Sequence, residues 1–407
     1  MIGQIRARLG ASSGLLDVAA LGGSRALAAL LASLAALLVA PALGPEQLGV
    51  WSMLLAVQAW ALHLSELGQR SVVTAEAPRT IGGARGLLRT YLILRLGLAV
   101  IVGGVVLIGA TKLAGLPSLA MALVLTSLVS IGLQLDWVAL VDGRTGQAAL
   151  VALVRPLTFC LLVLAAPAPL TVARVAQMFA LAWAAAAVVS WSVLLPGAVT
   201  RSGGDPPITA GTMVRLGVPL GLVTLSSQLL TTLDLIAVGA WLGPSSAGQL
   251  YLASAMAVAG VVFANAYNQW AMARLSPLRD DPQVFTAAVR LELRQALLVG
   301  LGVGVVVAGL APGLVPVLFG RDFALAGELL VWLVPWLVLQ HPTAVLLGAM
   351  TAARRQRAML AANALALAAF GLALGGALAT GDLRAVALAR GAAELVRLGL
   401  LWRALER

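Results

Sequence analysis

Two apolar runs joined by a short turn open the chain: residues 20–68 read ALGGSRALAALLASLAALLVAPALGPEQLGVWSMLLAVQAWALHLSELG. Each run, 20–41 and 48–68, matches the ~20 residues that an α-helix needs to cross ~30 Å of hydrocarbon. The Gly and Pro residues between the runs suit a tight turn at a helix end. This stretch therefore predicts a helical hairpin that crosses a membrane twice.

The rest of the 407-residue chain repeats this pattern, with charges, Pro and Gly separating further apolar runs. Hydrophobic residues make up 61% of the sequence and charged residues only 11%, with a mean hydropathy of +0.99. A soluble domain carries roughly a quarter charged residues, whereas lipid removes the need for a charged surface. The ten further predicted spans are 87–110, 117–141, 150–166, 172–196, 213–240, 246–272, 291–311, 325–350, 358–379 and 382–402.

The basic residues test this division into twelve spans. With the N-terminus inside, 22 of the 27 basic residues fall in or beside inner loops. Only Lys112, Arg174, Arg321 and Arg384 fall outside, and Arg390 lies within the last span. Such a bias is the positive-inside signal, and it accounts for the net charge of +11 without a nucleic-acid partner. We expect a multi-pass membrane protein with both termini cytoplasmic.

A short motif occurs twice, at the same point in each half of the chain. Leu43-Gly44-Pro45 with Gly49 recurs 199 residues later as Leu242-Gly243-Pro244 with Gly248. An even number of spans separates the copies, so both turns face the same side. The sequence therefore predicts an all-α polytopic protein with two parallel, pseudo-symmetric six-helix lobes, residues 1–200 and 201–407, around a central cavity.

Three stretches resemble the Wzx-type polysaccharide flippases of the multidrug/oligosaccharidyl-lipid/polysaccharide exporter superfamily. They are residues 42–71, with the first turn and Gly68; residues 215–256, with Gly217, Pro219, Asp234 and Tyr251; and residues 311–356, with LFGRDFALAGELL before span ten. Each motif alone is degenerate, and their order and spacing carry the resemblance, which covers most of the chain.

The resemblance implies a flippase of the bacterial inner membrane. It would move an undecaprenyl-pyrophosphate-linked oligosaccharide from the inner to the outer leaflet by alternating access, for cell-surface polysaccharide biosynthesis. It implies a polar, often cationic cavity, contact with membrane lipids and, in some members, a coupling cation (H+ or Na+). It implies neither a cofactor nor an enzymatic activity. Twelve-span drug exporters of the same superfamily are the closest alternative, and the lipid II flippases differ by typically carrying two further helices.

Charged residues within spans are costly, so each is a candidate for the transport path. Arginine suits a pyrophosphate because its planar fork can bind two oxygens. The candidate substrate arginines are Arg25, Arg95, Arg215 and Arg390. For Arg25 and Arg95 the alternative is a side chain that reaches the headgroups, for Arg215 a helix-end anchor, and for Arg390 a structural pair with Glu394 four residues on.

Other polar residues could bind an ion, a sugar or a neighbouring helix. Asp234 and Glu394 are candidates for ion coupling or cavity charge, with Asn363 as a possible co-ligand at Asp234. Asp136, His63 and Glu66 lie toward the inner side, where a His63–Glu66 pair would respond to pH. Asn265, Asn268 and Gln269 form a polar patch suited either to sugar hydroxyls or to helix packing. Pro342, after Gln340 and His341, predicts a broken helix that acts as a hinge.

Three other classes of membrane protein fit the sequence less well. A glycan polymerase or ligase would carry its chemistry on a large outer loop, and here the outer loops are short. No pattern of Cys and His has metal-binding spacing, and no Gly-Lys-Ser/Thr motif indicates ATP hydrolysis. A channel would carry repeated pore loops, which the sequence lacks.

Overall fold

The computed structural model describes residues 12–113, 115–198, 204–275, 278, 281–353 and 355–406. For residues 12–22, 24–26, 29, 113, 262–274 and 282 only the main chain is described. This part of the chain is almost entirely helical, as predicted. The helices are α2 (Ser12–Glu66), α3 (Gln69–Glu76), α4 (Gly83–Leu113), α5 (Ser118–Gly132), α6 (Asp136–Val141), α7 (Thr145–Ala165), α8 (Val172–Leu194), α9 (Ala210–Trp241), α10 (Pro244–Leu275), α11 (Pro282–Phe319), α12 (Ala324–Trp332), α13 (Val334–Ala352), α14 (Gln356–Thr380) and α15 (Leu383–Glu406).

These helices make twelve passes in the described part of the chain, in the predicted order. The long helix α2 counts as two passes, because Gly44 breaks it with a φ of 70° and a ψ of 172°. The pairs α5/α6 and α12/α13 each count as one broken pass. Most bounds agree with the prediction to within a few residues. The main differences are that α2 begins at Ser12 rather than 20, that α7 begins at Thr145 rather than 150, and that α11 extends over Pro282–Phe319 rather than 291–311.

Composition marks most of these passes as membrane spans. Within the described residues, eight helices are long and apolar enough to cross a membrane, or nine if the bent α12/α13 pair is one span. The helix α15 falls outside that set because it carries Arg384, Arg390, Glu394 and Arg397. Arg390, Glu394 and Arg397 are buried against other parts of the protein, so a test on composition alone misses this pass.

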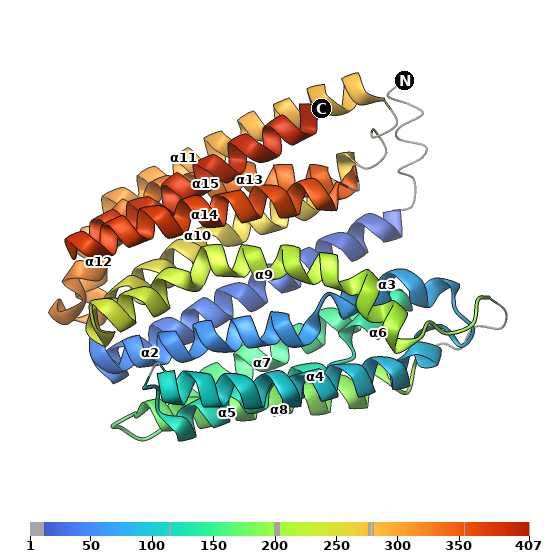
Figure 1. Ribbon diagram of the computed structural model, residues 1–407, viewed down its shortest axis with the longest axis horizontal. Helices are drawn as coiled ribbons and strands as arrows, with labels where there is room; N and C mark the ends of the chain where they lie inside the picture. Colours follow the sequence, from blue (N-terminus) through green and yellow to red (C-terminus); the bar gives the residue numbers. More distant parts are fainter. Residues whose placement is uncertain are drawn as a thin grey trace.

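The passes lie side by side along the long axis of the molecule and form two groups (Figure 1). The first group, α2 to α8, is drawn in blue to green, and the second, α10 to α15, in yellow to red. Helix α9 lies between them in this view. The two groups meet chiefly where α2 packs along α9 and α10. This arrangement of two parallel six-helix lobes agrees with the sequence prediction.

The two repeated turns contact each other at one end of the bundle, which we call the turn end. A Cβ added at Gly49 would lie 1.7 Å from the carbonyl oxygen of Pro244. Reciprocally, a Cβ added at Gly248 would lie 1.9 Å from the carbonyl oxygen of Pro45. Only glycine permits such an approach between two main chains. The repeated motif therefore closes this end of the bundle with the same contact made twice.

A second close contact joins the lobes at the opposite end, which we call the α3 end. There a Cβ at Gly68 would lie 2.3 Å from the carbonyl oxygen of Gly217. The preceding Leu67 has a φ of 42°, a left-handed conformation that is strained for a leucine. Between the two ends, the indole nitrogen of Trp60 donates a hydrogen bond to Thr232 Oγ1 at 2.8 Å. In this structure α2 and its continuation α3 are thus in contact with the second lobe at both ends.

Candidate functional site

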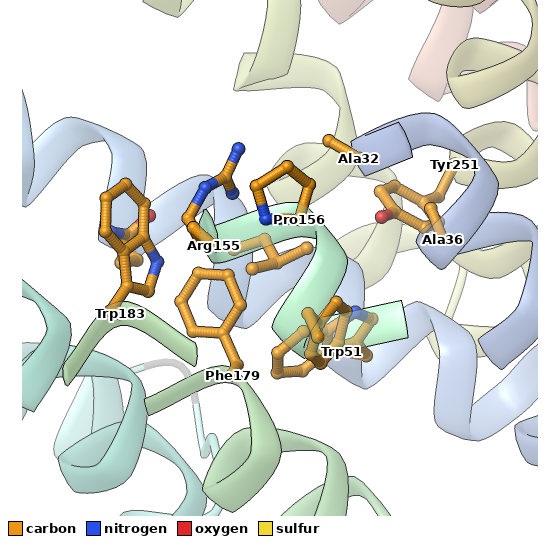
Figure 2. A pocket seen from close by; sticks show the side chains of 11 residues that line it. Ala32, Ala36, Trp51, Arg155, Pro156, Phe179, Trp183 and Tyr251 are labelled. Carbon is orange, nitrogen blue, oxygen red and sulfur yellow. The ribbon is translucent and has the colours of Figure 1, made fainter. Parts of the chain in front are cut away.

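A cavity of about 250 Å³ lies midway along the first lobe, against the second (Figure 2). Its walls come from both passes of α2, from α7 and α8, and from one residue of α10. The lining residues are Ala32, Ala36, Trp51, Leu55, Gln58, Arg155, Pro156, Phe159, Phe179, Trp183 and Tyr251. Aromatic and small apolar side chains dominate this wall, and a single side chain on it carries a formal charge.

That charge belongs to Arg155. It lies ten residues into α7, or about 15 Å along the helix axis, so it sits deep in the bundle. Its guanidinium carbon lies 4.6 Å from the ring centre of Trp183, which is a cation–π contact. Among the described residues no ion pair or hydrogen bond engages its side chain, and no carboxylate lines the cavity. Within that part of the chain, no residue occupies the hydrogen-bond donors of the guanidinium, which suit an anionic ligand.

Aromatic rings surround Arg155 and hold one another in place. Phe179 packs edge-on against three rings, with centroid separations of 5.5 Å to Trp51, 5.9 Å to Phe159 and 6.1 Å to Trp183. Such edge-to-face contacts give the wall a fixed shape. Tyr251 is the one lining residue from the second lobe. Figure 2 shows the Arg155 side chain between these rings. The cavity combines a cation with flat apolar surfaces, which suits an anion attached to ring-shaped groups.

The second lobe contains a different arrangement of charge around Arg390. This side chain, 2% exposed, reaches both carboxylate oxygens of Asp234, with the Nη2–Oδ1 hydrogen bond at 2.7 Å and the Nε–Oδ2 one at 3.0 Å. It also donates to Ser254 Oγ and to the carbonyl oxygen of Thr231, and its guanidinium carbon lies 5.3 Å from the Trp336 ring centre. This arginine is fully partnered.

A second buried arginine, Arg397, extends this network along α15. Its Nε donates to Asn363 Oδ1 at 2.8 Å, and its Nη1 lies 3.7 Å from Glu394 Oε1. Glu394 Oε2 accepts a hydrogen bond from Gln340 Nε2 at 2.9 Å. The Asn363 amide in turn donates to the hydroxyls of Ser226 and Ser227. Two arginines and two carboxylates thus balance each other in this lobe.

The structure corrects two expectations at this network. The spacing of Arg390 and Glu394 predicted a pair along α15, but the two side chains do not pair: Arg390 pairs with Asp234 on α9, and Glu394 with Arg397. Asp234 on α9 offers Arg390 both carboxylate oxygens, and Glu394 lies next to Arg397, three residues along the same helix. Pro342 does not break its helix, since α13 is continuous from Val334 to Ala352; the sharp bend of 47° lies before it, between α12 and α13.

The inner-side candidates of the first lobe form a third group near the α3 end. Arg95, 1% exposed, donates to Ser65 Oγ and lies 3.8 Å from Glu66 Oε2. Asp136 pairs with Arg70 of α3. His63 shares a hydrogen bond with Gln228 of α9 and lies in the field of Glu66. Glu66 is therefore shared between Arg95 and His63, and these residues brace the end of α2 rather than line the cavity.

The other predicted residues lie elsewhere. Arg215 is exposed near the start of α9, away from the cavity lining. The side chains of Arg25, Asn265, Asn268 and Gln269 lie outside the described residues. Within the described part of the chain, no group of three or more His, Cys, Asp or Glu residues could hold a metal ion.

Sequence reasoning missed Arg155 as a site residue. It counted Arg155 among the inner-side basic residues, because the fifth span was predicted to begin at residue 150. The helix begins five residues earlier, which moves Arg155 toward the membrane centre. The available signal was the order Arg155-Pro156 inside an otherwise apolar run, with Trp183 on the next predicted span.

Comparison with known proteins supports the fold. No protein-family model matches the chain, and no curated protein sequence matches it. Solved structures do match. The lipid II flippase MurJ, in an inward closed conformation, has a TM-score of 0.70 and 14% identity, with 97% of this chain and 88% of that chain covered.

Two further matching structures are transporters. An inward-facing multidrug resistance transporter of the MATE family, within the MOP superfamily, has a TM-score of 0.67, 15% identity, and coverage of 93% of this chain and 94% of that one. A MOP superfamily transporter from Pyrococcus furiosus, described as having a binding pocket of reverse polarity, has a TM-score of 0.59, 13% identity, and coverage of 96% and 97%. The chain therefore has the fold of the MOP superfamily transporters and flippases.

Proposed function

We propose that this protein is a flippase for an anionic, lipid-linked glycan, and that Arg155 binds the phosphate groups of its substrate. The observation that carries the proposal is Arg155 in an aromatic cavity, where no carboxylate of the described residues pairs with it. Keeping an arginine charged inside a membrane protein costs free energy unless something pairs with it. A pyrophosphate would supply that partner, and the rings of Trp51 and Trp183 would contact the adjoining sugar.

The sequence resemblance to Wzx-type flippases supplies the finer identity. We propose an undecaprenyl-pyrophosphate-linked oligosaccharide, moved from the inner to the outer leaflet for cell-surface polysaccharide biosynthesis. The protein would lie in the bacterial inner membrane, with both termini cytoplasmic, the turn end outside and lobes of residues 1–200 and 201–407. MurJ, which shares the fold, is itself a flippase for a lipid-linked substrate.

The alternative is an exporter of drugs, as the MATE structures with the same fold suggest. The charge of the cavity separates the two functions. A cationic drug entering it would approach Arg155 with no carboxylate on the lining to offset the repulsion. A neutral or anionic compound would not meet this barrier. The cavity therefore favours the glycolipid over cationic drugs.

A coupling cation, H+ or Na+, remains part of the proposal, with Asp234 as its predicted site. Arg390 already occupies both carboxylate oxygens of Asp234. A cation would therefore have to displace the guanidinium during the transport cycle. Running the assay below with and without H+ and Na+ gradients tests this requirement directly.

The test reconstitutes the protein in liposomes with a fluorescent undecaprenyl-pyrophosphate oligosaccharide in the inner leaflet and measures its exposure to an outside quencher. We expect flipping by the natural chain and at least a tenfold lower rate for Arg155→Gln, because the loss of a charge-assisted hydrogen bond costs about 1.5–3 kcal/mol. Arg155→Lys should retain part of the rate, since it keeps the charge but not the fork.

The matched control is Arg174→Gln, which removes an exposed arginine at the start of α8. This variant should move the glycolipid at the same rate as the natural chain. A cationic dye in the same liposomes provides the second arm. Movement of the dye without movement of the glycolipid would replace the flippase proposal with the exporter alternative, and an unchanged rate in Arg155→Gln would remove Arg155 from the substrate path.

A further inference from the structure

The contact at the turn end and the wall of the cavity lie on the same two helix ends. In the first lobe, Gly49 makes the contact and Trp51 follows two residues later. In the second lobe, Gly248 makes the contact and Tyr251 follows three residues later, about 4.5 Å along α10. Both aromatic residues line the cavity around Arg155. The position of Tyr251 relative to Trp51 therefore depends on how closely the two turns approach.

Tyr251 differs from the other lining residues because it alone comes from the second lobe. The first lobe supplies Arg155 and the rings around it, and these stay together when that lobe moves as a body. Tyr251 instead moves with α10. Separation of the two turns would draw α10 away from α2, and Tyr251 would leave the cavity.

We propose that Tyr251 couples substrate binding to closure of the turn end. The cavity is complete only while Gly49 and Gly248 contact the opposite Pro244 and Pro45. A ligand that touches both Arg155 and Tyr251 therefore holds the turn end closed, and opening of that end weakens its binding. The identity of the ligand rests on the proposed function, whereas the coupling rests on the positions of Gly248 and Tyr251 on α10.

Thermodynamic reciprocity gives this coupling a measurable form. If the ligand favours the closed turn end, then anything that opens the turn end must lower the affinity for the ligand by the same factor. An added methyl group at Gly49 or Gly248 opens it, since the new atom would lie within 2 Å of a main-chain carbonyl oxygen. Neither glycine lines the cavity, so any effect on binding must pass through closure.

The experiment places spin labels at Gln47 and Ser245, both exposed on the two turns, in a Cys160→Ser background. It measures the distance between the labels and the affinity for geranylgeranyl diphosphate in the purified full chain. We expect Gly49→Ala and Gly248→Ala to lengthen the distance and to lower the affinity roughly tenfold, within the 5- to 150-fold range of such couplings. Geranylgeranyl diphosphate should shorten the distance in the natural chain.

Tyr251→Leu separates the coupling from simple loss of fold. It should lower the affinity without lengthening the distance in the free protein, and the ligand should no longer shorten it. Gly371→Ala is the control, because a Cβ at this helical glycine of α14 meets nothing within 4 Å. Gly371→Ala should change neither the distance between the labels nor the affinity for geranylgeranyl diphosphate.

Two results would overturn the coupling: an unchanged affinity in glycine variants whose label distance has lengthened, or an unchanged label distance in those variants. A natural chain that binds the cationic dye but not the diphosphate would defeat the proposed function alone. The same variants would then test the coupling with the dye. A chain that binds neither compound would defeat both.

Discussion

The two lobes bury arginine in opposite ways. Arg390 in the second lobe has a bidentate carboxylate, a hydroxyl, a carbonyl oxygen and a tryptophan ring around it. Arg155 in the first lobe has only a tryptophan ring among the described residues. Arg155 lies within a helix that composition alone marks as a membrane span, whereas α15, which carries Arg390, has too many charges to pass that test.

This difference indicates that Arg390 stabilises the fold, whereas Arg155 is available to bind a ligand. Removing a fully partnered arginine leaves its carboxylate buried without a counter-ion, so stability falls. Removing an arginine without a partner relieves an uncompensated cost, so stability holds and only the binding of a partner from outside is lost. Three predictions test the comparison, each with its own measurement.

The largest effect is expected for Arg390→Met. It should lower the free energy of unfolding by about 3–5 kcal/mol, because Asp234 stays buried without its partner. Thermal unfolding in detergent measures this. The double variant Arg390→Met/Asp234→Leu should recover most of the loss. As a control, Arg384→Met breaks the half-exposed pair with Glu328 and should cost no more than about 1 kcal/mol. If Arg390→Met unfolded at the same midpoint temperature as the natural chain, the pair would contribute nothing to stability.

The second effect is expected for Arg155→Met. It should leave the free energy of unfolding unchanged or raise it by about 1–3 kcal/mol, because an uncompensated charge leaves the bundle. The same thermal measurement repeated with geranylgeranyl diphosphate should show stabilisation of the natural chain but none of the variant. A loss of stability as large as that of Arg390→Met would mean that Arg155 has a partner in the fold, and the comparison between the lobes would fail.

The smallest effect is expected for the two tryptophans that face these arginines. Trp336→Phe and Trp183→Phe each weaken a cation–π contact, worth about 0.5–1 kcal/mol at most in this exchange. Trp336→Phe should lower the free energy of unfolding by that amount. Trp183→Phe should instead lower the affinity for the diphosphate about two- to fivefold. The reverse assignment of the two effects would contradict the roles given to the two arginines.

The sequence predicts the fold well because lipid imposes a simple rule on each span. Main-chain groups must pair within a helix, so length and apolarity locate the passes without knowledge of their neighbours. The repeated Leu-Gly-Pro turns also predicted that the chain has two parallel, similar halves. Exact helix bounds were less predictable, because α7 and α11 extend beyond the apolar part of their sequences.

The sites were harder to predict because each site is defined by contacts between residues on different helices. The sequence singled out Asp234 and Arg390 as costly charges, and their pairing across 156 positions follows only from the packing of α9 against α15. The spacing of Arg390 and Glu394 suggested a local pair that the fold does not make. Arg155 was missed because a shift of five residues in one helix start changes a headgroup-facing residue into a central one.

The paired turns also bear on how such a protein can change over generations. Every amino acid carries the same main-chain carbonyl. The carbonyls at Pro45 and Pro244 could therefore make the same contact whatever side chains surrounded them. The contact requires glycine at positions 49 and 248, and the turns before it favour glycine at positions 44 and 243, where φ is +70° and +90°. A lineage that retains these four glycines can keep this joint between its two halves while the side chains around it change.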